Sequence, residues 1–294
     1  MIRIGTCSWK EKTLLQSDFY PRSVKTAEDR LKFYTEHFDT VEVDSSYYAI
    51  SAERISEGWA ERTPDNFVFH IKAYGALTGH SIDLKTLPKD IRSNLPDHYQ
   101  DKCRAVIKEP ALLEDIYERF YNTLQPLHHA NKLGIIVFQY PPWFYYSEAN
   151  LKKVLRVSSL LSDYRVGIEF RHGSWLTPDR FETVISALQE HNLIYITADE
   201  PQYDSLATIP FKPFVTGDIA YVRFHGRNKG NWLKKGIDTS LRYSYDYSLK
   251  ELDSFLPALT DMNKSALVTF AVFNNCHSRK AIDNAILLRD LLNR

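Results

Sequence analysis

Charged side chains follow directly on an apolar run near the middle of the chain. Residues 166–168 have the composition of a buried β-strand, and Glu169, Arg171 and His172 come next, with Trp175 shortly after. Charged groups are rarely buried without a partner. Because side chains alternate across a strand with a period of two, Glu169 and Arg171 share one face. This placement predicts the floor of a binding pocket at the end of the strand.

The same alternation places polar side chains at the ends of other strand-like runs. In 40–44, Glu42 and Asp44 share one face, and in 67–72 His70 and Lys72 do so. Further runs end in Gln139, Asp199, Arg223, His225, Asn274 and Asn275. If these runs are parallel strands of a barrel, their C-terminal ends converge on one mouth, where active sites are built.

Side chains that can exchange a proton are the candidate catalytic groups, and they are Glu42, Asp44, Glu169, Asp199 and His225. Paired carboxylates in unlike environments suit glycosidic and proton-transfer chemistry. The alternative for each carboxylate is an ion pair with Lys72, Arg171 or Arg223 that only stabilises the fold. The sequence gives no separations between carboxylates, so retaining and inverting geometries both stay open.

Side chains that offer donors or ring faces at strand ends are the candidate substrate-binding residues, and they are Lys72, Gln139, Arg171, His172, Trp175, Arg223, Arg227, Asn274 and Asn275. Arg223 and Arg227 follow the seventh run, where barrels often hold phosphate, and arginine binds oxyanions through a two-pronged contact. We therefore expect an anion or phosphate subsite there, with a solvated basic loop as the alternative. Lys72 is read as a salt-bridged or substrate-binding lysine in preference to a Schiff-base lysine.

We expect no metal, and the sequence identifies no cofactor. The histidines and carboxylates at the strand ends could supply ligands, but no HExxH motif is present and the nearby cations offset the carboxylates. Cys7 and Cys276 end the first and last runs, which are neighbours in a closed barrel. A buried, inert pair is the expected role of these cysteines.

Eight short β-like runs recur along the chain, at 2–8, 40–46, 67–73, 134–140, 164–170, 193–199, 219–225 and 266–274. Helical patterns separate most of them, among them 27–38, a helix from Ser147, one capped at 177–179, and 279–293. Strands alternating with helices indicate βαβ units and a parallel sheet, and eight units suggest closure. The predicted fold is an α/β protein, a single (β/α)8 TIM-type barrel spanning 1–294.

Two stretches depart from this alternation. Residues 74–133 are too long for one strand-to-helix connection, so we expect an insertion between strands 3 and 4 on the mouth side. It contains a polar loop at 79–100 and a helix at about 110–124. Residues 200–218 hold three prolines and are predicted to form a loop.

Composition narrows the classes of function. Lys plus Arg and Asp plus Glu are each 37 in 294 residues, so the formal net charge is zero and no long-range field favours nucleic acid or membranes. Three cysteines without a CxxC pair indicate reduced thiols. With no signal peptide and no membrane span in the sequence, we expect a cytoplasmic protein.

The strand-end motifs together resemble the YecE-like family, a group known as a domain of unknown function, along nearly the whole chain. The residues that carry the resemblance are 5–9, 42–48, 69–72, 139–142, 169–175, 223–227 and 273–275. The resemblance implies a TIM-type barrel and brings no established reaction. One departure is visible, because the family has a His directly after the Asn pair and here Cys276 precedes His277.

Three functions follow as hypotheses. The first is an enzyme that uses acid/base chemistry, hydrolase-like, on a polar anionic or sugar-containing small molecule. The second is a nucleic-acid binding or processing barrel resembling metal-dependent endonucleases, which zero net charge does not favour. The third is a barrel that binds a metabolite without changing it.

Overall fold

Eight parallel strands close into a barrel in the computed structural model, which describes residues 1–294. The barrel strands are β1 (Ile2–Thr6), β2 (Thr40–Val43), β3 (Val68–Lys72), β6 (Leu133–Gln139), β7 (Arg165–Glu169), β8 (Leu193–Asp199), β9 (Ile219–Phe224) and β10 (Val268–Phe273). All eight lie within or just beside the runs predicted from the sequence. The predicted TIM-type barrel is therefore confirmed.

The first and last strands close the barrel. β1 pairs in parallel with β10 from Ile2–Thr269 to Thr6–Phe273, and its other edge meets β2 where Thr6 pairs with Val41. Every barrel strand consequently has a neighbour on both sides, which leaves no open sheet edge. Parallel pairing directs all eight C-terminal ends to one end of the barrel.

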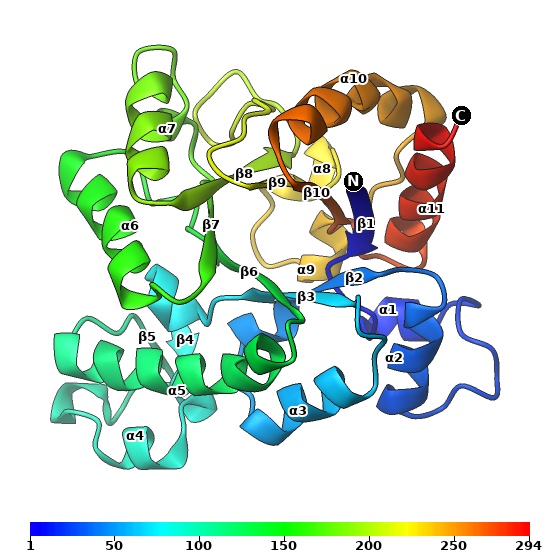
Figure 1. The fold of residues 1–294 in the computed structure, drawn as a ribbon. Coiled ribbons are helices and arrows are strands. Elements are labelled where there is room, and N and C mark those ends of the chain that lie inside the picture. Colours follow the sequence, from blue (N-terminus) through cyan, green and yellow to red (C-terminus); the bar gives the residue numbers. More distant parts are fainter.

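Helices surround the strands (Figure 1). The longer ones are α2 (Ala27–Thr35), α3 (Glu53–Glu61), α5 (Pro110–His129), α6 (Glu148–Leu160), α7 (Phe181–Glu190), α10 (Leu249–Ser265) and α11 (Lys280–Leu292). Four short helices lie in the connections, namely α1 (Lys12–Leu15), α4 (Lys89–Ser93), α8 (Lys229–Trp232) and α9 (Thr239–Arg242). No helix of the chain combines the length and apolar character needed to cross a bilayer.

Local side-chain chemistry explains where several helices begin. Thr26 and Ser248 each form a capping box with the third residue of α2 and α10, and the Ser147 side chain accepts from the Asn150 backbone N–H at the start of α6. The expected cap at 177–179 is wrong. Those residues form a turn closed by bonds from the backbone N–H groups of 180 and 181 to the Thr177 carbonyl, and α7 starts after it without a side-chain cap.

The connection between β3 and β6 contains structure of its own. It includes the antiparallel pair β4 (Ile82–Asp83) and β5 (Arg104–Ala105). In the chain, α4 lies between these two strands and α5 follows β5. The predicted helix at 110–124 continues to His129 and accommodates Pro126. That this segment is an insertion on the barrel pattern stays a prediction. Residues 200–218 contain no helix or strand, as expected from their prolines.

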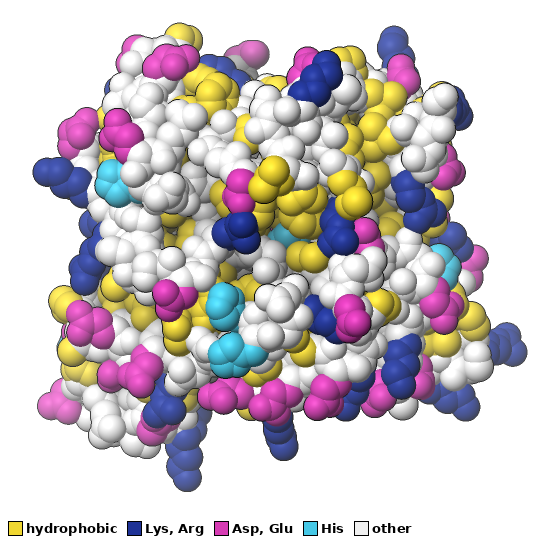
Figure 2. Space-filling model, in the orientation of Figure 1, with side chains coloured by type: hydrophobic (Ala, Val, Ile, Leu, Met, Phe, Trp, Pro, Cys, Tyr) yellow, Lys and Arg dark blue, Asp and Glu magenta, His cyan; other side chains and the backbone are white.

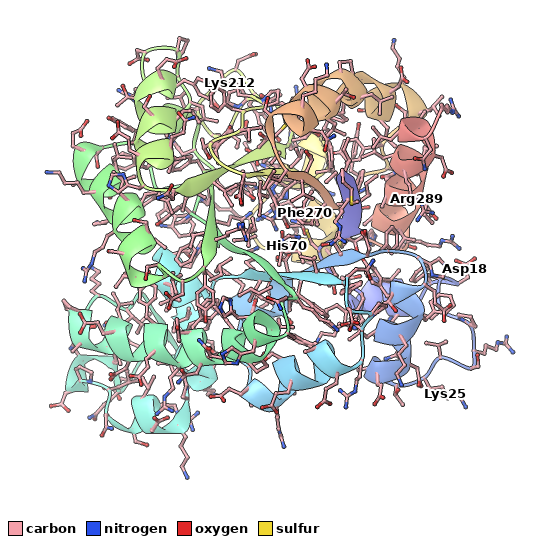
Figure 3. The ribbon with its side chains drawn as sticks, viewed as in Figure 1. Asp18, Lys25, His70, Lys212, Phe270 and Arg289 are labelled. Atoms are coloured by element: carbon pink, nitrogen blue, oxygen red, sulfur yellow. The ribbon has the colours of Figure 1, made fainter.

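Two apolar layers hold the barrel together. One cluster packs between strands and helices, and a second fills the inside of the barrel with residues that include Ile135, Ile196, Tyr221 and Phe270. Figure 3 shows His70 and Phe270 near the middle of the barrel, with ring centroids 4.3 Å apart. Charged side chains of both signs are scattered over the outer parts of the face drawn in Figure 2. The polar groups at the strand ends therefore rest on an apolar plug.

Candidate functional site

A pocket of about 720 Å³ opens at the C-terminal ends of the barrel strands. Polar side chains at the ends of strands that are neighbours around the barrel form its floor. They are Cys7 after β1, Asp44 after β2, Lys72 on β3, Gln139 on β6, Arg171 after β7 and Asn274 after β10. The alternation of each strand turns these side chains inward. Five of the predicted site residues therefore line one pocket, and Cys7 and Cys276 line it as well.

A second layer of charge lies beneath this floor, centred on Arg223. Its Nη2 lies 2.6 Å from Glu42 Oε1 and its Nη1 donates to Glu169 Oε2, and all three side chains are fully buried. The Tyr221 hydroxyl donates to the other Glu42 oxygen at 2.9 Å. Arg223 also approaches Asp44 Oδ1 at 3.4 Å, which links the buried layer to the pocket floor.

Glu169 accepts more contacts than any other carboxylate at the site. Gln139 Nε2 donates to its Oε1 at 2.6 Å, and His225 Nε2 lies 3.0 Å from the same atom. Asn274 Nδ2 lies 2.9 Å from His225 Nδ1, so the imidazole accepts there and its Nε2–H donates to Glu169. Burial alone would raise the pKa of Glu169, but Arg223 and His225 hold it well below its usual range. Glu169 is consequently a fixed anion that orients its neighbours.

Glu200 belongs to the same network, although the sequence did not single it out. It is fully buried, its Oε2 lies 2.9 Å from Arg171 Nε without the alignment of a hydrogen bond, and its Oε1 accepts from the Ile209 backbone N–H at 2.8 Å. Burial raises the pKa of Glu200 to about 7, and Arg171 offsets only part of that effect. The strand parity 194, 196, 198, 200 could have found it.

The network has four carboxyl groups for three cations, which are Glu42, Asp44, Glu169 and Glu200 against Lys72, Arg171 and Arg223. A buried excess charge is costly, so the cluster favours holding a proton. Burial raises the pKa of Glu42, with Arg223 opposing. Burial would also raise the pKa of Asp44, but Lys72 and Arg223 lower it below its usual value. Of these two carboxyl groups, Glu42 is the one that takes up a proton more readily and Asp44 the one that stays ionised.

The spacing of three side chains at the floor also suits a metal ion. Ligand atoms of Cys7, Glu42 and Asp44 lie within 4.8 Å of one another. Arg223 Nη2 lies among them, 3.8 Å from the Cys7 sulfur in addition to its contacts with both carboxylates. The guanidinium thus supplies the positive charge that a cation would bring. That the site uses no metal stays a prediction.

Aromatic side chains form two walls above the floor. On one side the Tyr47 and His80 rings, and then the His80 and Trp143 rings, meet edge to face with centroids 5.1 and 5.6 Å apart. On the other side Trp232 meets Tyr243 at 5.5 Å. All five line the pocket, with Trp143 largely exposed at its rim. Such walls suit a ligand that contains a ring.

The structure places two of the predicted residues in a separate cluster on the outer side of the barrel strands. Arg227 contacts Asp199 with Nη2 2.7 Å from Oδ1, and also approaches Glu251, while the Tyr247 hydroxyl donates to Asp199 at 2.6 Å. Asp199 is on the opposite face of β8 from Glu200. Neither Arg223 nor Arg227 lines the pocket and carboxylates pair with both, so the anion subsite expected around them stays a prediction that this geometry does not favour.

Three further predicted residues serve packing or local structure. Trp175 is fully buried, stacks on Phe170 at 4.2 Å and donates to a backbone carbonyl, so it has no face left for a ligand. His172 Nδ1 lies 2.8 Å from Ser174 Oγ, outside the pocket lining. Asn275 donates to Asn284 and to a backbone carbonyl behind the barrel. None of the three lines the pocket, and their predicted role in substrate binding stays a prediction.

Some pocket residues carried no local signal. His80 and Arg104 come from the 74–133 segment, which brings them to the mouth through its own fold. Tyr243 lies in the long connection after β9. No periodicity marks these positions, because long-range packing alone places them over the strand ends.

Comparison with known proteins agrees with this architecture. The chain is 31% identical over 296 residues to UPF0759 protein YunF of Bacillus subtilis (strain 168), which covers 99% of this chain and 95% of that protein. A crystal structure of a DUF72 family protein from Enterococcus faecalis V583 is similar with a TM-score of 0.80 and 26% identity, covering 100% of this chain and 96% of that one. A crystal structure of a DUF72 family protein from Thermotoga maritima MSB8 is similar with a TM-score of 0.78 and 25% identity, and the match covers 100% of both chains.

The match to a family model is equally extensive. The model described as "Protein of unknown function DUF72" matches residues 3–294, which include every strand-end motif that the site uses. The resemblance inferred from those motifs is thereby confirmed. This chain belongs to the DUF72 family of proteins of unknown function.

Proposed function

We propose that this chain is an enzyme that performs acid/base chemistry, of the hydrolytic type, on a polar small molecule that is anionic or contains a sugar. The observation that carries the proposal is the pairing of Asp44, which reaches the pocket, with Glu42, which is fully buried beneath it. Their environments push the two pKa values apart, Glu42 upward and Asp44 downward. In a carboxyl pair separated in this way, one member stays ionised and can exchange a proton with substrate, while the other keeps its proton at the same pH.

Asp44 is the group that would touch the reacting atoms. Its ionised carboxylate takes a proton from an attacking water as the water oxygen bonds to the substrate. The bond from the attacked atom to the departing group then breaks, and the same carboxyl gives its proton to that group. Glu42 remains protonated below it, while Lys72 and Arg223 stabilise the Asp44 anion. Glu169 and His225, predicted as catalytic from the sequence, lie under the floor and act in this proposal as positioning residues.

The test is a search for turnover with an inactive variant beside the wild type. The purified protein is incubated with glycosides, sugar phosphates and nucleotides, and products are followed by mass spectrometry. Asp44→Asn should lower kcat for any substrate found by about 10²- to 10⁴-fold, the range that a general acid/base contributes. Arg180→Met, which changes an arginine outside the pocket, should leave kcat unchanged.

Two outcomes would count against this assignment. Full activity in Asp44→Asn would mean that another group carries the chemistry. A ligand that binds at the mouth of the wild-type protein and is recovered unchanged under every condition would favour a metabolite-binding barrel.

A further inference from the structure

Two cations of the pocket floor each rest on an aromatic ring of one wall. Lys72 Nζ lies 5.0 Å from the centroid of the Tyr47 ring, and the guanidinium carbon of Arg171 lies 5.1 Å from that of Trp232. Both side chains are 11% exposed and both line the pocket. The rings fix the direction of each cation, and burial strengthens its attraction for an anion.

Lys72 and Arg171 each have N–H hydrogen-bond donors for which the protein supplies no acceptor. The Lys72 ammonium carries three donors, and its ion-pair contact is Asp44 Oδ1 at 3.5 Å. Arg171 directs Nη1 to Glu169 and Nε to Glu200 and also contacts the Tyr243 side chain, so these three partners occupy only part of its five N–H donors. The donors that remain are those from which an oxyanion accepts.

The charges that line the pocket add to this attraction. Among the side chains that line the pocket, five cations, Lys10, Lys72, Arg104, Arg171 and Arg242, stand against three anions, Glu11, Asp44 and Asp238, while Glu169 and Glu200 pair with Arg171 from beneath the floor. Glu11 and Asp238 accept from backbone N–H groups where α1 and α9 begin, at 2.7 and 2.8 Å. Lys10, Arg104 and Arg242 form no ion pair, so the rim carries unpaired positive charge.

His80 lies within the influence of both floor cations. Burial, and then the charges of Lys72 and Arg171, lower its pKa to about 4. The imidazole is therefore neutral near pH 7. Lys72 and Arg171 thus both act on His80, a member of one aromatic wall.

We propose that the space between Lys72 and Arg171 binds an oxyanion, a phosphate or a carboxylate, attached to a ring that lies between the two aromatic walls. This inference rests on the proposed function and deepens it, because it names the group by which the substrate is held beside Asp44. It also moves the anion subsite from the end of β9 to the ends of β3 and β7.

The test measures the binding of inorganic phosphate by thermal shift and calorimetry at pH 8 and constant ionic strength. Lys72→Met should weaken phosphate binding at least tenfold. Arg171→Met alone would leave buried Glu200 without its partner and endanger folding. The double variant Arg171→Met/Glu200→Gln removes both charges of that pair, and it should also weaken binding at least tenfold.

Matched controls separate the pocket from cations elsewhere. Arg180 lies 4.9 Å from the Tyr146 ring and Lys212 lies 4.5 Å from the Phe181 ring, so both repeat the cation–aromatic contact outside the pocket lining. Figure 3 shows Lys212 near the outer edge of the molecule. Arg180→Met and Lys212→Met should bind phosphate as the wild type does. If they and the pocket variants all bind phosphate equally, the subsite is wrong.

Ring-bearing ligands identify the source of the anion. Glucose 6-phosphate, glucuronate and glucose are compared with inorganic phosphate in the wild type. Tighter binding of one charged sugar supports the proposal and names phosphate or carboxylate as its anion. Glucose that binds as tightly as both charged sugars would overturn the role of the oxyanion, and sugar phosphate no tighter than inorganic phosphate would overturn the role of the ring.

The Asp44→Asn variant distinguishes failure of this subsite from failure of the proposed function. It removes a negative charge beside Lys72, so phosphate should bind it severalfold more tightly than the wild type while turnover is lost. If this variant keeps full turnover and its phosphate binding depends on Lys72, the proposed function of Asp44 is wrong and the proposed subsite is supported. If turnover is lost but neither the wild type nor any variant binds phosphate, the proposed function of Asp44 is supported and the proposed subsite is wrong.

Discussion

Glu42 and Asp44 are two positions apart and face the same way, yet they differ in their access to water. Glu42 is fully buried, and burial raises its pKa above the usual value of a glutamic acid. Asp44 opens to the pocket beside Lys72, and its pKa is lowered despite the burial that opposes this. One proton shared by such a pair titrates as a property of both groups.

Glu42→Gln should change the pH dependence of turnover on the alkaline side. In the wild type Glu42 loses its proton as the pH rises through its raised pKa, which places a second negative charge beside the Asp44 anion and should lower kcat. Glutamine keeps the shape of protonated Glu42 and cannot ionise, so the alkaline decline should disappear while activity near pH 6 stays within about tenfold. The pH profile of kcat measures this, and an unchanged alkaline limb would exclude Glu42 as its source.

His70 is a neutral histidine enclosed by the barrel. Its Nδ1 accepts from the Ile135 backbone N–H at 3.1 Å, its Nε2 has no hydrogen-bond partner, and the imidazole packs at 74° against the Phe270 ring. Burial lowers the pKa of His70 to about 3.

The pKa of His70 makes folding less stable in acid. Its folded value is depressed below the usual 6.5, so between about pH 6.5 and 3 the unfolded chain takes up a proton that the folded chain refuses, and stability falls with pH. His70→Gln should therefore lose roughly 1.5 kcal/mol less stability than the wild type between pH 6.5 and pH 5. Urea unfolding at both pH values measures the difference. His129→Gln, on the exposed end of α5, is the control, and equal losses in all three proteins would disprove the assignment.

The connection between β9 and α10 supplies one wall of the pocket, and its conformation depends on a glycine. Gly226 has φ +85°, and a Cβ added there would lie 2.6 Å from Tyr245 Cβ. Its N–H donates to the Tyr247 hydroxyl at 2.8 Å. Gly236 in the same connection has φ +73° with nothing within 4 Å of such a Cβ. The two glycines thus separate backbone strain from a steric clash.

Gly226→Ala should destabilise the fold more than Gly236→Ala. Both replacements carry the cost of a left-handed conformation, about 1–2 kcal/mol, and the first adds the cost of overpacking, about 1–3 kcal/mol. Chemical denaturation of the two variants measures the difference. If Gly226→Ala lowers the free energy of unfolding no more than Gly236→Ala does, the Tyr245 side chain moves away without cost and the predicted steric clash is wrong.

Elements with strong periodicity were predictable, and connections were not. The barrel strands follow from apolar runs of alternating parity, and that same parity turns Asp44, Lys72 and Gln139 into the pocket. The start of α7 was misplaced, because Thr177 uses its carbonyl to close a turn before the helix begins. The β4–β5 pair has only two residues in each strand, too few for any pattern to appear.

The whole molecule combines a neutral total charge with a pocket lining in which cations outnumber anions. Lys plus Arg equals Asp plus Glu at 37 each, while the pocket lining holds five cations and three anions. At about 0.15 M salt the field of such a pocket is screened within about 8 Å. The positive charge therefore acts on a ligand that enters the mouth and not on a distant polyanion.

Duplex DNA should accordingly bind weakly. In about 0.15 M salt a fluorescent oligonucleotide duplex should show no saturable binding at micromolar protein, because nucleic-acid affinity arises mainly from many phosphate contacts. Fluorescence anisotropy across a salt series measures this, with bovine serum albumin as a non-binding control. Tight binding with a steep salt slope would instead support the hypothesis of a nucleic-acid binding or processing barrel.

The sequence by itself determined the barrel and the family, because strand parity, the alternation of strands with helices and the strand-end motifs are local and repeated along the chain. It also indicated that polar groups meet at one mouth. Tertiary structure alone decided which of them reach the pocket. Arg223 and Glu169 neutralise each other below the floor, Trp175 packs out of reach, and Lys72 and Arg171 keep free donors. Burial and pairing depend on neighbours from distant parts of the chain, and no local pattern records them.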